Sequence, residues 1–405
     1  MTLFEDLKWR GLIKDITSPE LEKKLNEGGM TFYIGTDPTA DSMHIGHYSS
    51  FLISKRLAKY GHHPILLIGG ATGRIGDPKP TTEREMKSVE EIEKNAIGLT
   101  KQAESIFGFE VVNNWDWSKD INFIDFLRDY GKFFNINYML DKDIIRRRLD
   151  TGITYTEFSY MIMQAMDFLH LYETKNCTLQ VAGSDQWGNI TAGVDLIRKK
   201  TGNEAYGFTM PLILDKDGKK FGKSEGNALW LDKTKTSAYE LYQYLINTDD
   251  ELVIDYLKKL TFLPKEEIEK IETLHKNNLE KRIAQQELAK QIITDLHGKE
   301  EYLHAKEVSE CLFTGKVSSL TDEEIKTVFK GVPTFDYEEK SLIDLLVDNK
   351  ITSSKREARE FLKNNAISVN GEFIEDENYL LDKTRKYNIV RRGKKKYFVF
   401  VNQNK

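Results

Sequence analysis

The chain has 405 residues, 40% hydrophobic and 30% charged, which is enough to bury more than one core. No segment approaches the roughly eighteen apolar residues of a membrane helix, and Met1–Arg10 lacks the blocks of a signal peptide, so we expect a cytoplasmic protein without a membrane partner. Only Cys177 and Cys311 are present, which excludes a disulfide framework and a cysteine metal cluster.

Charge is distributed unevenly along the chain. The net charge is -5, yet Lys383–Lys405 holds nine Lys or Arg and no acidic residue. The remainder therefore carries 50 basic and 64 acidic residues, a net charge of -14. A basic tail on an acidic body indicates a polyanionic partner.

Short apolar segments alternate with helical patterns over residues 1–214. The predicted strands are TFYI, HPILLI, CTLQVA and FTMPLIL, and helical patterns such as Tyr48–Tyr60 and Ser88–Phe107 separate them. This alternation predicts an α/β domain with a mostly parallel sheet.

The rest of the chain has a different organisation. After a connector at 215–236, the pattern is helical over 237–322, and an acidic linker with Gly331 and Pro333 is expected at 323–340. Residues 341–405 predict a small α+β module, with two short helices, an Asn370-Gly371 hairpin and a last basic strand.

The stretch YIGTDPTADSMHIGH runs from a strand into a turn with two histidines. Asp37-Pro38 stops the strand, Gly46 lets the backbone approach a ligand, and His44 and His47 fall in the first turn of the next helix. That position suits donors to a phosphate or a ribose ring. A zinc half-site and a pair of surface histidines are the alternatives, and no third metal ligand stands nearby.

Two further patterns point to a ligand. DGKKFGKSEGN places Lys220 and Lys223 beside Ser224 in a Gly-flanked loop, which suits a pyrophosphate leaving group, although an exposed basic turn is the plainer interpretation. In the buried helix 156–171 the residues Tyr160, Gln164 and Asp167 form one polar stripe, at i, i+4 and i+7. A buried stripe requires either an internal hydrogen-bond network or a bound ligand.

HIGH (44–47) with KFGKS (220–224) resembles the signature pair of class I aminoacyl-tRNA synthetases. YIGTDPTADSMHIGH, LIGGATGRIGDP, TEFSYMIMQAMDFLHLY and GSDQWGNITAG together resemble bacterial-type tyrosyl-tRNA synthetases, over essentially the whole chain. The resemblance implies a Rossmann-like catalytic domain, an anticodon-binding-type helical domain and, at 341–405, a small RNA-binding domain first known from a ribosomal protein.

The resemblance implies a tyrosine subsite. Tyr33 and Asp167 match the pair that binds the substrate phenol; Tyr160, Gln164 and Asp77 match ligands of its ammonium group; Gln180 and Gln186 complete the pocket, Gln186 near the carboxylate. The phenol pair is physically sensible, because phenylalanine would leave both protein groups buried and unpaired.

The resemblance also implies ATP as substrate. Asp37, Gly46, His47, Gly183, Asp185 and Lys223 match nucleotide-binding positions; Thr39, His44, Lys220, Lys223 and Ser224 match groups that hold the departing phosphates. Mg²⁺ is expected to accompany ATP through phosphate oxygens and water, without a dedicated protein metal site.

Tyrosine tRNA and a second copy of the chain are the expected macromolecular partners. FIDFLRDYGKFFNINYML is the expected apolar interface helix of a homodimer. RNA binding is expected from Lys355, Arg356, Arg359 and Lys363 on a helix and from Arg391, Arg392 and Lys394 near the end of the chain, unless these groups form only a solvated charged face.

The sequence departs from the family in two places. Ile34 stands where many relatives have a cysteine that touches the ribose, and Thr81 or Thr82 where a lysine often assists pyrophosphate, so that only Lys79 and Arg84 offer a substitute. Rival classes remain: a tryptophanyl relative, a small nucleotidyltransferase, and an RNA-binding protein with a retired catalytic core. A dehydrogenase is disfavoured, since no acidic residue grips a ribose about twenty positions after GGATGRIG.

Overall fold

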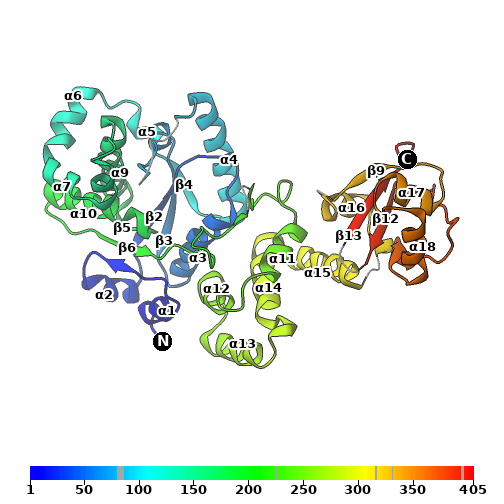
Figure 1. Ribbon diagram of the computed structural model, residues 1–405. Coiled ribbons are helices and arrows are strands. Elements are labelled where there is room, and N and C mark those ends of the chain that lie inside the picture. The colour runs from blue at the N-terminus through cyan, green and yellow to red at the C-terminus, as the bar shows by residue number, and fades with distance from the viewer. Residues whose placement is uncertain (80–85, 225–226, 315–316, 331, 394–395) are drawn as a thin grey trace. The chain divides into compact units, whose positions relative to one another are not determined.

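The computed structural model describes residues 1–405 except 80–85, 225–226, 315–316, 331 and 394–395. The predicted site residue Lys394 therefore lies outside the described residues, and so do the side chains of Lys223 and Ser224. The chain divides into two compact units, Met1–Thr236 with Thr248–Ile292, and Ser237–Asn247 with Ile293–Lys405. Figure 1 shows the elements of each unit.

A six-stranded sheet forms the centre of the first unit, in the order β1-β6-β5-β2-β3-β4. Its strands are β1 (Asp15–Ile16), β2 (Thr31–Thr36), β3 (His63–Ile68), β4 (Glu110–Asn113), β5 (Cys177–Gly183) and β6 (Tyr206–Met210). All neighbours are parallel except β1 and β6. The winding reverses between β2 and β5, and such a switch point is where parallel sheets bind ligands.

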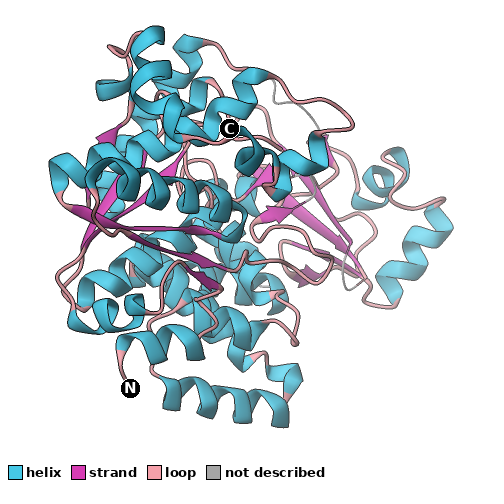
Figure 2. Cartoon of the chain, turned by 90° about the vertical axis from the view of Figure 1, so that its left-hand side faces the viewer, coloured by secondary structure: helices cyan, strands magenta, loops and turns pink. Residues whose placement is uncertain are grey.

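Helices cover both faces of this sheet (Figure 1). The helices α9 (Tyr155–Lys175) and α10 (Trp187–Thr201) pack on β5 and β6, whereas α3 (Ile45–Lys59) and α4 (Val89–Phe107) pack on β3 and β4. Figure 2 distinguishes the helices from the strands by colour. The predicted α/β parallel-sheet domain is confirmed.

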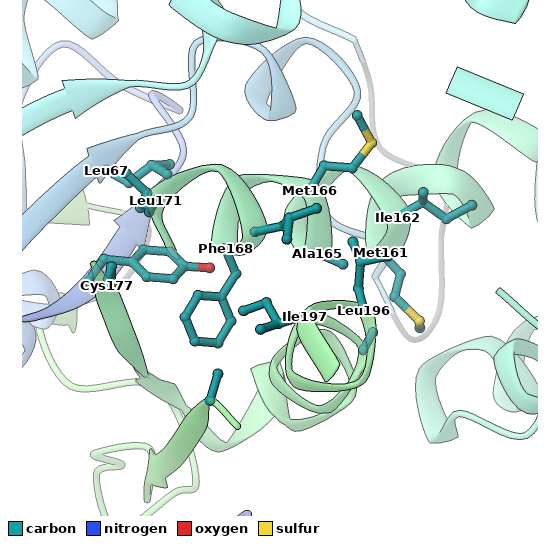
Figure 3. Packing of buried hydrophobic residues seen from close by; sticks show 14 of the residues in the cluster. Leu67, Met161, Ile162, Ala165, Met166, Phe168, Leu171, Cys177, Leu196 and Ile197 are labelled. Atoms are coloured by element: carbon teal, nitrogen blue, oxygen red, sulfur yellow. The ribbon is translucent and has the colours of Figure 1, made fainter. Parts of the chain in front are cut away.

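Helix α9 is buried on nearly every side, as its composition predicts. The Thr154 side chain caps its first turn by accepting from the Glu157 amide, and Asn176, at φ 51°, ends it in the left-handed conformation. Figure 3 shows Phe168 of α9 directed toward Ile197 of α10 within the core. This packing holds the polar stripe of α9 in one orientation.

The first unit contains smaller helices as well. They are α1 (Leu3–Trp9), α2 (Glu20–Glu27), α5 (Trp115–Ser118), α8 (Asp143–Arg148), α12 (Val253–Leu260), α13 (Lys265–Asn277) and the first part of α14 (Ile283–His297). None of the described helices combines the length and the hydropathy needed to cross a membrane.

Three local predictions require correction. The expected interface helix is a series of short helical segments, α6 (Phe123–Asp125), η2 (Phe126–Tyr130), η3 (Gly131–Phe133) and α7 (Ile136–Leu140). Gly131 and the side-chain cap Asn135, which starts a new helix, interrupt it. The strand predicted in FTMPLIL ends at Met210, before Pro211. Strand β4, at the sheet edge, was not anticipated.

The second unit contains a five-stranded sheet, in the order β11-β10-β12-β13-β9. Its strands are β9 (Thr334–Asp336), β10 (Ile367–Val369), β11 (Glu372–Phe373), β12 (Tyr387–Arg392) and β13 (Lys396–Val401). Asn370 and Gly371 have positive φ angles of 51° and 96°, which confirms the predicted hairpin turn. The predicted last strand is a second hairpin, formed by β12 and β13.

Both faces of this sheet are covered. The helices α17 (Leu342–Asp348) and α18 (Lys355–Lys363) pack on the face of Val390 and Phe400, and α16 (Asp322–Val328) on the face of Ile389 and Val399. The unit also contains α11 (Ala238–Ile246) and α15 (Lys299–Thr314). The segment expected to be a linker, 323–340, thus contains most of α16 and strand β9, which pairs parallel with β13.

Candidate active site

One cleft, with a volume of about 390 Å³, opens at the carboxyl ends of β2 and β5. It is lined by every predicted catalytic-domain residue whose side chain the structure describes: Tyr33, Asp37, Thr39, His44, Gly46, His47, Asp77, Tyr160, Gln164, Asp167, Gln180, Gly183, Asp185, Gln186 and Lys220. These residues come from segments far apart in the chain, so the fold gathers them at the switch point of the sheet.

Tyr33 and Asp167 line the inner part of this cleft. The Asp167 carboxylate accepts from Asn114 Nδ2 and from Trp117 Nε1, both at 2.9 Å. The Tyr33 hydroxyl is buried and has no hydrogen-bond partner in the part of the chain that the structure describes. A buried hydroxyl without a partner is unusual in a folded protein, and it marks a position where a ligand can bind.

Burial dominates the electrostatics of this pair. Desolvation raises the pKa of the Asp167 carboxyl to about 7, against the opposing effect of its two hydrogen-bond donors. Desolvation, followed by the charge of Asp167, raises the pKa of Tyr33 well above its usual value. Tyr33 is therefore a neutral phenol at any physiological pH.

A second polar group surrounds Asp37. Its carboxylate accepts from the Tyr160 hydroxyl at 3.1 Å and from Thr72 Oγ1 at 2.8 Å. Burial and the negative charge of Asp37 raise the pKa of Tyr160 well above its usual value. Asp37 thus joins the end of β2 to α9.

Amide side chains complete the cleft. Gln186 Nε2 donates to the Asp77 carboxylate at 2.7 Å. Asn189 Nδ2 donates to the Asp77 carboxylate and to Gln186 Oε1. By contrast, the side-chain oxygens of Gln164 and Gln180 are buried without a partner among the described residues. Two amide acceptors and the Tyr33 hydroxyl therefore face the same cavity with unused hydrogen-bonding capacity.

The two signature histidines lie at the start of α3. His44 is its N-cap residue, and its Nδ1 accepts from the Gly46 amide at 3.1 Å, while His47 Nδ1 accepts from the His44 amide at 3.2 Å. The centroids of the His44 and His47 rings lie 4.0 Å apart. These bonds leave the Nε2 side of each ring as the donor, at a helix end that favours anions.

Lys220 reaches the cleft from the loop that follows β6. A bridge between Leu214 and Lys220 closes this loop, and Lys220 Nζ lies 3.4 Å from the Asp185 carboxylate. The backbone of Lys223 and Ser224 forms strand β7, which pairs with β8 (Asn227–Ala228). The loop thus carries one described cation to the edge of the cavity.

The predicted RNA-binding cations differ in their surroundings. Lys355 and Arg359 form ion pairs with Asp344 and Glu377, each at 2.6 Å. Arg391 lies over the Phe373 ring, and Arg392 donates to the Ile351 carbonyl. Arg356 and Lys363 are exposed on α18 and have no ion pair among the described residues.

The sequence did not reveal Asn114, Trp117, Thr72 or Asn189 as site residues. Asn114 and Trp117 follow β4, and the signal for them was FEVVNNWDW, a short apolar segment that ends in polar and aromatic residues. Thr72 lies in the quoted stretch LIGGATGRIGDP, and Asn189 in GSDQWGNITAG. Only the contacts with Asp37, Asp77 and Asp167 reveal that these residues support the cleft.

Comparison with known proteins agrees with this geometry. Residues 25–314 match the family described as tRNA synthetases class I (W and Y), and residues 324–400 match the tyrosine–tRNA ligase SYY-like C-terminal domain. A tyrosine–tRNA ligase from Listeria monocytogenes is 50% identical, and one from Leuconostoc mesenteroides 48% identical, each over 98% of this chain and 99% of the relative. The chain belongs to the tyrosine–tRNA ligases, a family of class I tRNA synthetases.

Solved structures of synthetases share the fold. A truncated mitochondrial tyrosyl-tRNA synthetase from Aspergillus nidulans matches with a TM-score of 0.67 and 32% identity, over 77% of this chain and 94% of that one. The enzyme from Archaeoglobus fulgidus, solved with L-tyrosine, matches with a TM-score of 0.56 over 75% of this chain and 100% of that one, at 17% identity, and so supports the fold alone.

The two departures from the family can now be located. Ile34 lines the cleft, where its side chain offers no hydrogen bond to a ribose. In the loop after Asp77, the Lys79 carbonyl accepts from Arg148, whereas Thr81, Thr82 and Arg84 lie outside the described residues. No group of three or more metal-binding side chains occurs in the described ranges.

Proposed function

We propose that this cleft activates L-tyrosine with ATP, and that the chain then esterifies tyrosine tRNA. In the first step a tyrosine carboxylate oxygen attacks the α-phosphate, and pyrophosphate leaves. In the second step a ribose hydroxyl of the terminal adenosine attacks the tyrosyl carbonyl, and AMP leaves. No covalent bond to the protein is needed, so catalysis depends on positioning and on charge stabilisation.

The observation that carries the tyrosine assignment is the set of buried polar groups without partners. The Tyr33 hydroxyl and the Gln164 and Gln180 oxygens face one cavity, which Asp167 also lines. The phenol of a bound tyrosine would donate to the Asp167 carboxylate and accept from the Tyr33 hydroxyl. The ammonium group of the same tyrosine would donate to the two glutamine side-chain oxygens and to the Asp77 carboxylate. Tryptophan has no hydroxyl and would leave Tyr33 unpaired.

The outer part of the cleft suits the nucleotide. His47, Gly183 and Asp185 would hold the ribose and Asp37 would stand near it, while Gly46 lets the start of α3 come close to the phosphates. Thr39, His44 and Lys220 would hold the departing phosphates, with Lys223 and Ser224 from the same loop. Mg²⁺ would accompany ATP, bound mainly by phosphate oxygens and water.

The second unit would bind tRNA. Its exposed basic residues suit an RNA backbone, whose recognition depends on phosphate contacts and shape. We place the reaction in the cytoplasm, where tRNA is charged for translation.

The functional protein would be a homodimer. Seven exposed large hydrophobic side chains occur within residues 123–155: Phe123, Ile124, Leu127, Ile136, Tyr138, Leu149 and Tyr155. Exposed apolar residues so concentrated in one segment indicate a protein interface. The broken helical segment that carries most of them therefore remains the proposed contact region.

Pyrophosphate exchange into ATP, measured with each amino acid in turn, tests the proposed activation step. We expect exchange with tyrosine and hardly any with tryptophan or phenylalanine, since both lack the phenol. Robust exchange with tryptophan would assign the cleft to the other amino acid of this synthetase group.

A further inference from the structure

The loop that carries Lys220 rests on a tyrosine outside the cleft. Tyr256 of α12 donates its hydroxyl proton to the Leu214 carbonyl at 2.9 Å. Its ring meets Phe221 edge to face, with centroids 4.9 Å apart and an interplanar angle of 72°. Both rings are buried, at 3% and 2% exposed. Tyr256 thus contacts residues at both ends of the segment 214–221, while it does not line the cleft.

The same loop is bound to the histidine turn on its other side. The Ile45 amide donates to the Leu229 carbonyl at 2.7 Å, and the Leu231 amide donates to the Met43 carbonyl at 2.8 Å. Gly222, at φ 82°, lies so close that an added Cβ would stand 2.0 Å from Ile45 Cγ2. The described residues of the lysine loop, 214–224 and 227–231, are therefore held between α3 and α12.

Hydrogen bonds from two buried arginines hold the C-terminal end of helix α12 in place. Arg10, the C-cap residue of α1, donates to the Lys258 carbonyl at 2.9 Å and to the Leu263 carbonyl at 2.7 Å. Arg56 of α3 donates to the Thr261 carbonyl at 2.6 Å, and both guanidinium groups pair with buried Asp6. Charged groups bonded in this way fix the end of α12 against α1 and α3.

We propose that Tyr256 is a positioning residue for tyrosine activation. Its hydroxyl fixes the Leu214 carbonyl, and its ring fixes Phe221, the residue next to Lys220. Together they set where the Lys220 ammonium group lies relative to the departing phosphates. A misplacement of about 1 Å near a reacting group can lower a rate by roughly 10²-fold, so a single hydrogen bond at the loop base has a measurable effect.

The inference rests on the proposed role of Lys220 in tyrosine activation. A double-mutant cycle distinguishes a failure of that role from a failure of the positioning role of Tyr256. Tyr256→Phe keeps a ring against Phe221 and removes only the hydroxyl. We expect it to lower kcat for tyrosyl-adenylate formation by about 10-fold, with KM for tyrosine and the melting temperature nearly unchanged. In a Lys220→Ala background the same change should cost less than about 2-fold, because the group that Tyr256 positions is gone.

Tyr206→Phe is the matched control. Tyr206 of β6 is also buried; its hydroxyl donates to Glu20 at 2.9 Å, outside the segment 214–221, and Tyr206 does not line the cleft. Its removal should leave kcat unchanged in both backgrounds.

Each other outcome overturns the inference. An unchanged kcat in Tyr256→Phe, with Lys220→Ala impaired, refutes the positioning role alone. An equal loss in both backgrounds shows that the hydroxyl acts independently of Lys220. A loss accompanied by a lower melting temperature and a higher tyrosine KM indicates a general structural role. An unimpaired Lys220→Ala refutes the proposed role of Lys220 and the inference with it.

Discussion

Tyr33 of β2 and Gln180 of β5 stand directly opposite each other on neighbouring parallel strands. Both side chains line the cleft, and each contributes a buried polar oxygen without a partner among the described residues. The pair lies where the sheet reverses its winding, so the two strands reach the same ligand from opposite halves of the sheet. The register of these two strands therefore positions both side chains of the proposed tyrosine subsite.

Tyrosine affinity should depend on pH through Asp167. Its carboxyl has a pKa of about 7 in the free protein, raised by burial, and it must be ionised to accept from a substrate phenol as well as from Asn114 and Trp117. We therefore expect the dissociation constant of tyrosine to fall as pH rises from about 6 to 8, by up to about tenfold per unit below pH 7. Isothermal titration calorimetry measures this, and Asp167→Asn should lose the dependence. A flat profile for the native chain would contradict an ionisable Asp167.

Trp117→Phe should weaken tyrosine binding. The change removes one of two donors to the Asp167 carboxylate and retains a ring that can stack on His170, whose centroid lies 4.3 Å away. The Trp117 hydrogen bond lowers the pKa of Asp167, so its loss should leave less of the free protein with an ionised carboxylate, and KM for tyrosine at pH 7 should rise by about several-fold, with a smaller change in kcat. Trp115→Phe, which keeps a ring below Arg74, is the control and should behave as the native chain.

Lys220→Ala should lower kcat for activation by about 10- to 1000-fold, the range for loss of one preorganised charge contact, while KM for tyrosine stays nearly constant. Lys216→Ala is the matched control, because Lys216 lies in the same loop but pairs with Asp249 at 3.1 Å and does not line the cleft. A change confined to KM would mean that Lys220 contributes to ground-state binding only.

Arg356→Ala combined with Lys363→Ala should weaken tRNA binding and leave adenylate formation intact. Each neutralised phosphate contributes a slope of roughly -0.7 to -0.9 in log K against log salt, so the slope should become shallower by about 1.4–1.8. The pair Lys355→Ala and Arg359→Ala should change it less, since acidic partners already neutralise these side chains.

Point variants are preferable to truncation for this test. A chain stopped near residue 331 would lose β12 and β13, which supply the packing partners of Ile325 and Phe329. Such a chain would expose apolar surface, and lost activity could then reflect misfolding. An unchanged salt slope in the Arg356 and Lys363 variant would show that α18 does not contact tRNA.

Ile136→Asp should favour the monomer. Ile136 is 56% exposed and belongs to the group of exposed apolar side chains within residues 123–155. A carboxylate at this position would be buried when two chains associate, and its desolvation would oppose dimerisation. Sedimentation should yield twice the mass of one chain for the native protein and a lower value for the variant. Leu274→Asp, at an exposed position on α13, is the control and should remain a dimer.

Local sequence patterns were enough to predict where several elements of the catalytic unit lie. The histidine turn, the lysine loop and the stripe on α9 depend on residue type and short spacing, so HIGH, KFGKS and the i, i+4, i+7 pattern were enough to locate them, whereas the family resemblance was needed to match them to substrates. The parallel α/β class followed in the same way, because period and turn residues are local properties.

Long-range contacts decided what these patterns left open. Asn114 and Trp117 support Asp167 only because β4 pairs with β3 at the sheet edge, and β9 joins the second sheet only through β13. The helix predicted over 123–140 is broken into short segments, since Gly131 and the Asn135 cap interrupt it. Strand pairing and burial depend on contacts between residues that are distant in the chain. Local sequence patterns do not contain these contacts, so only the tertiary structure decides them.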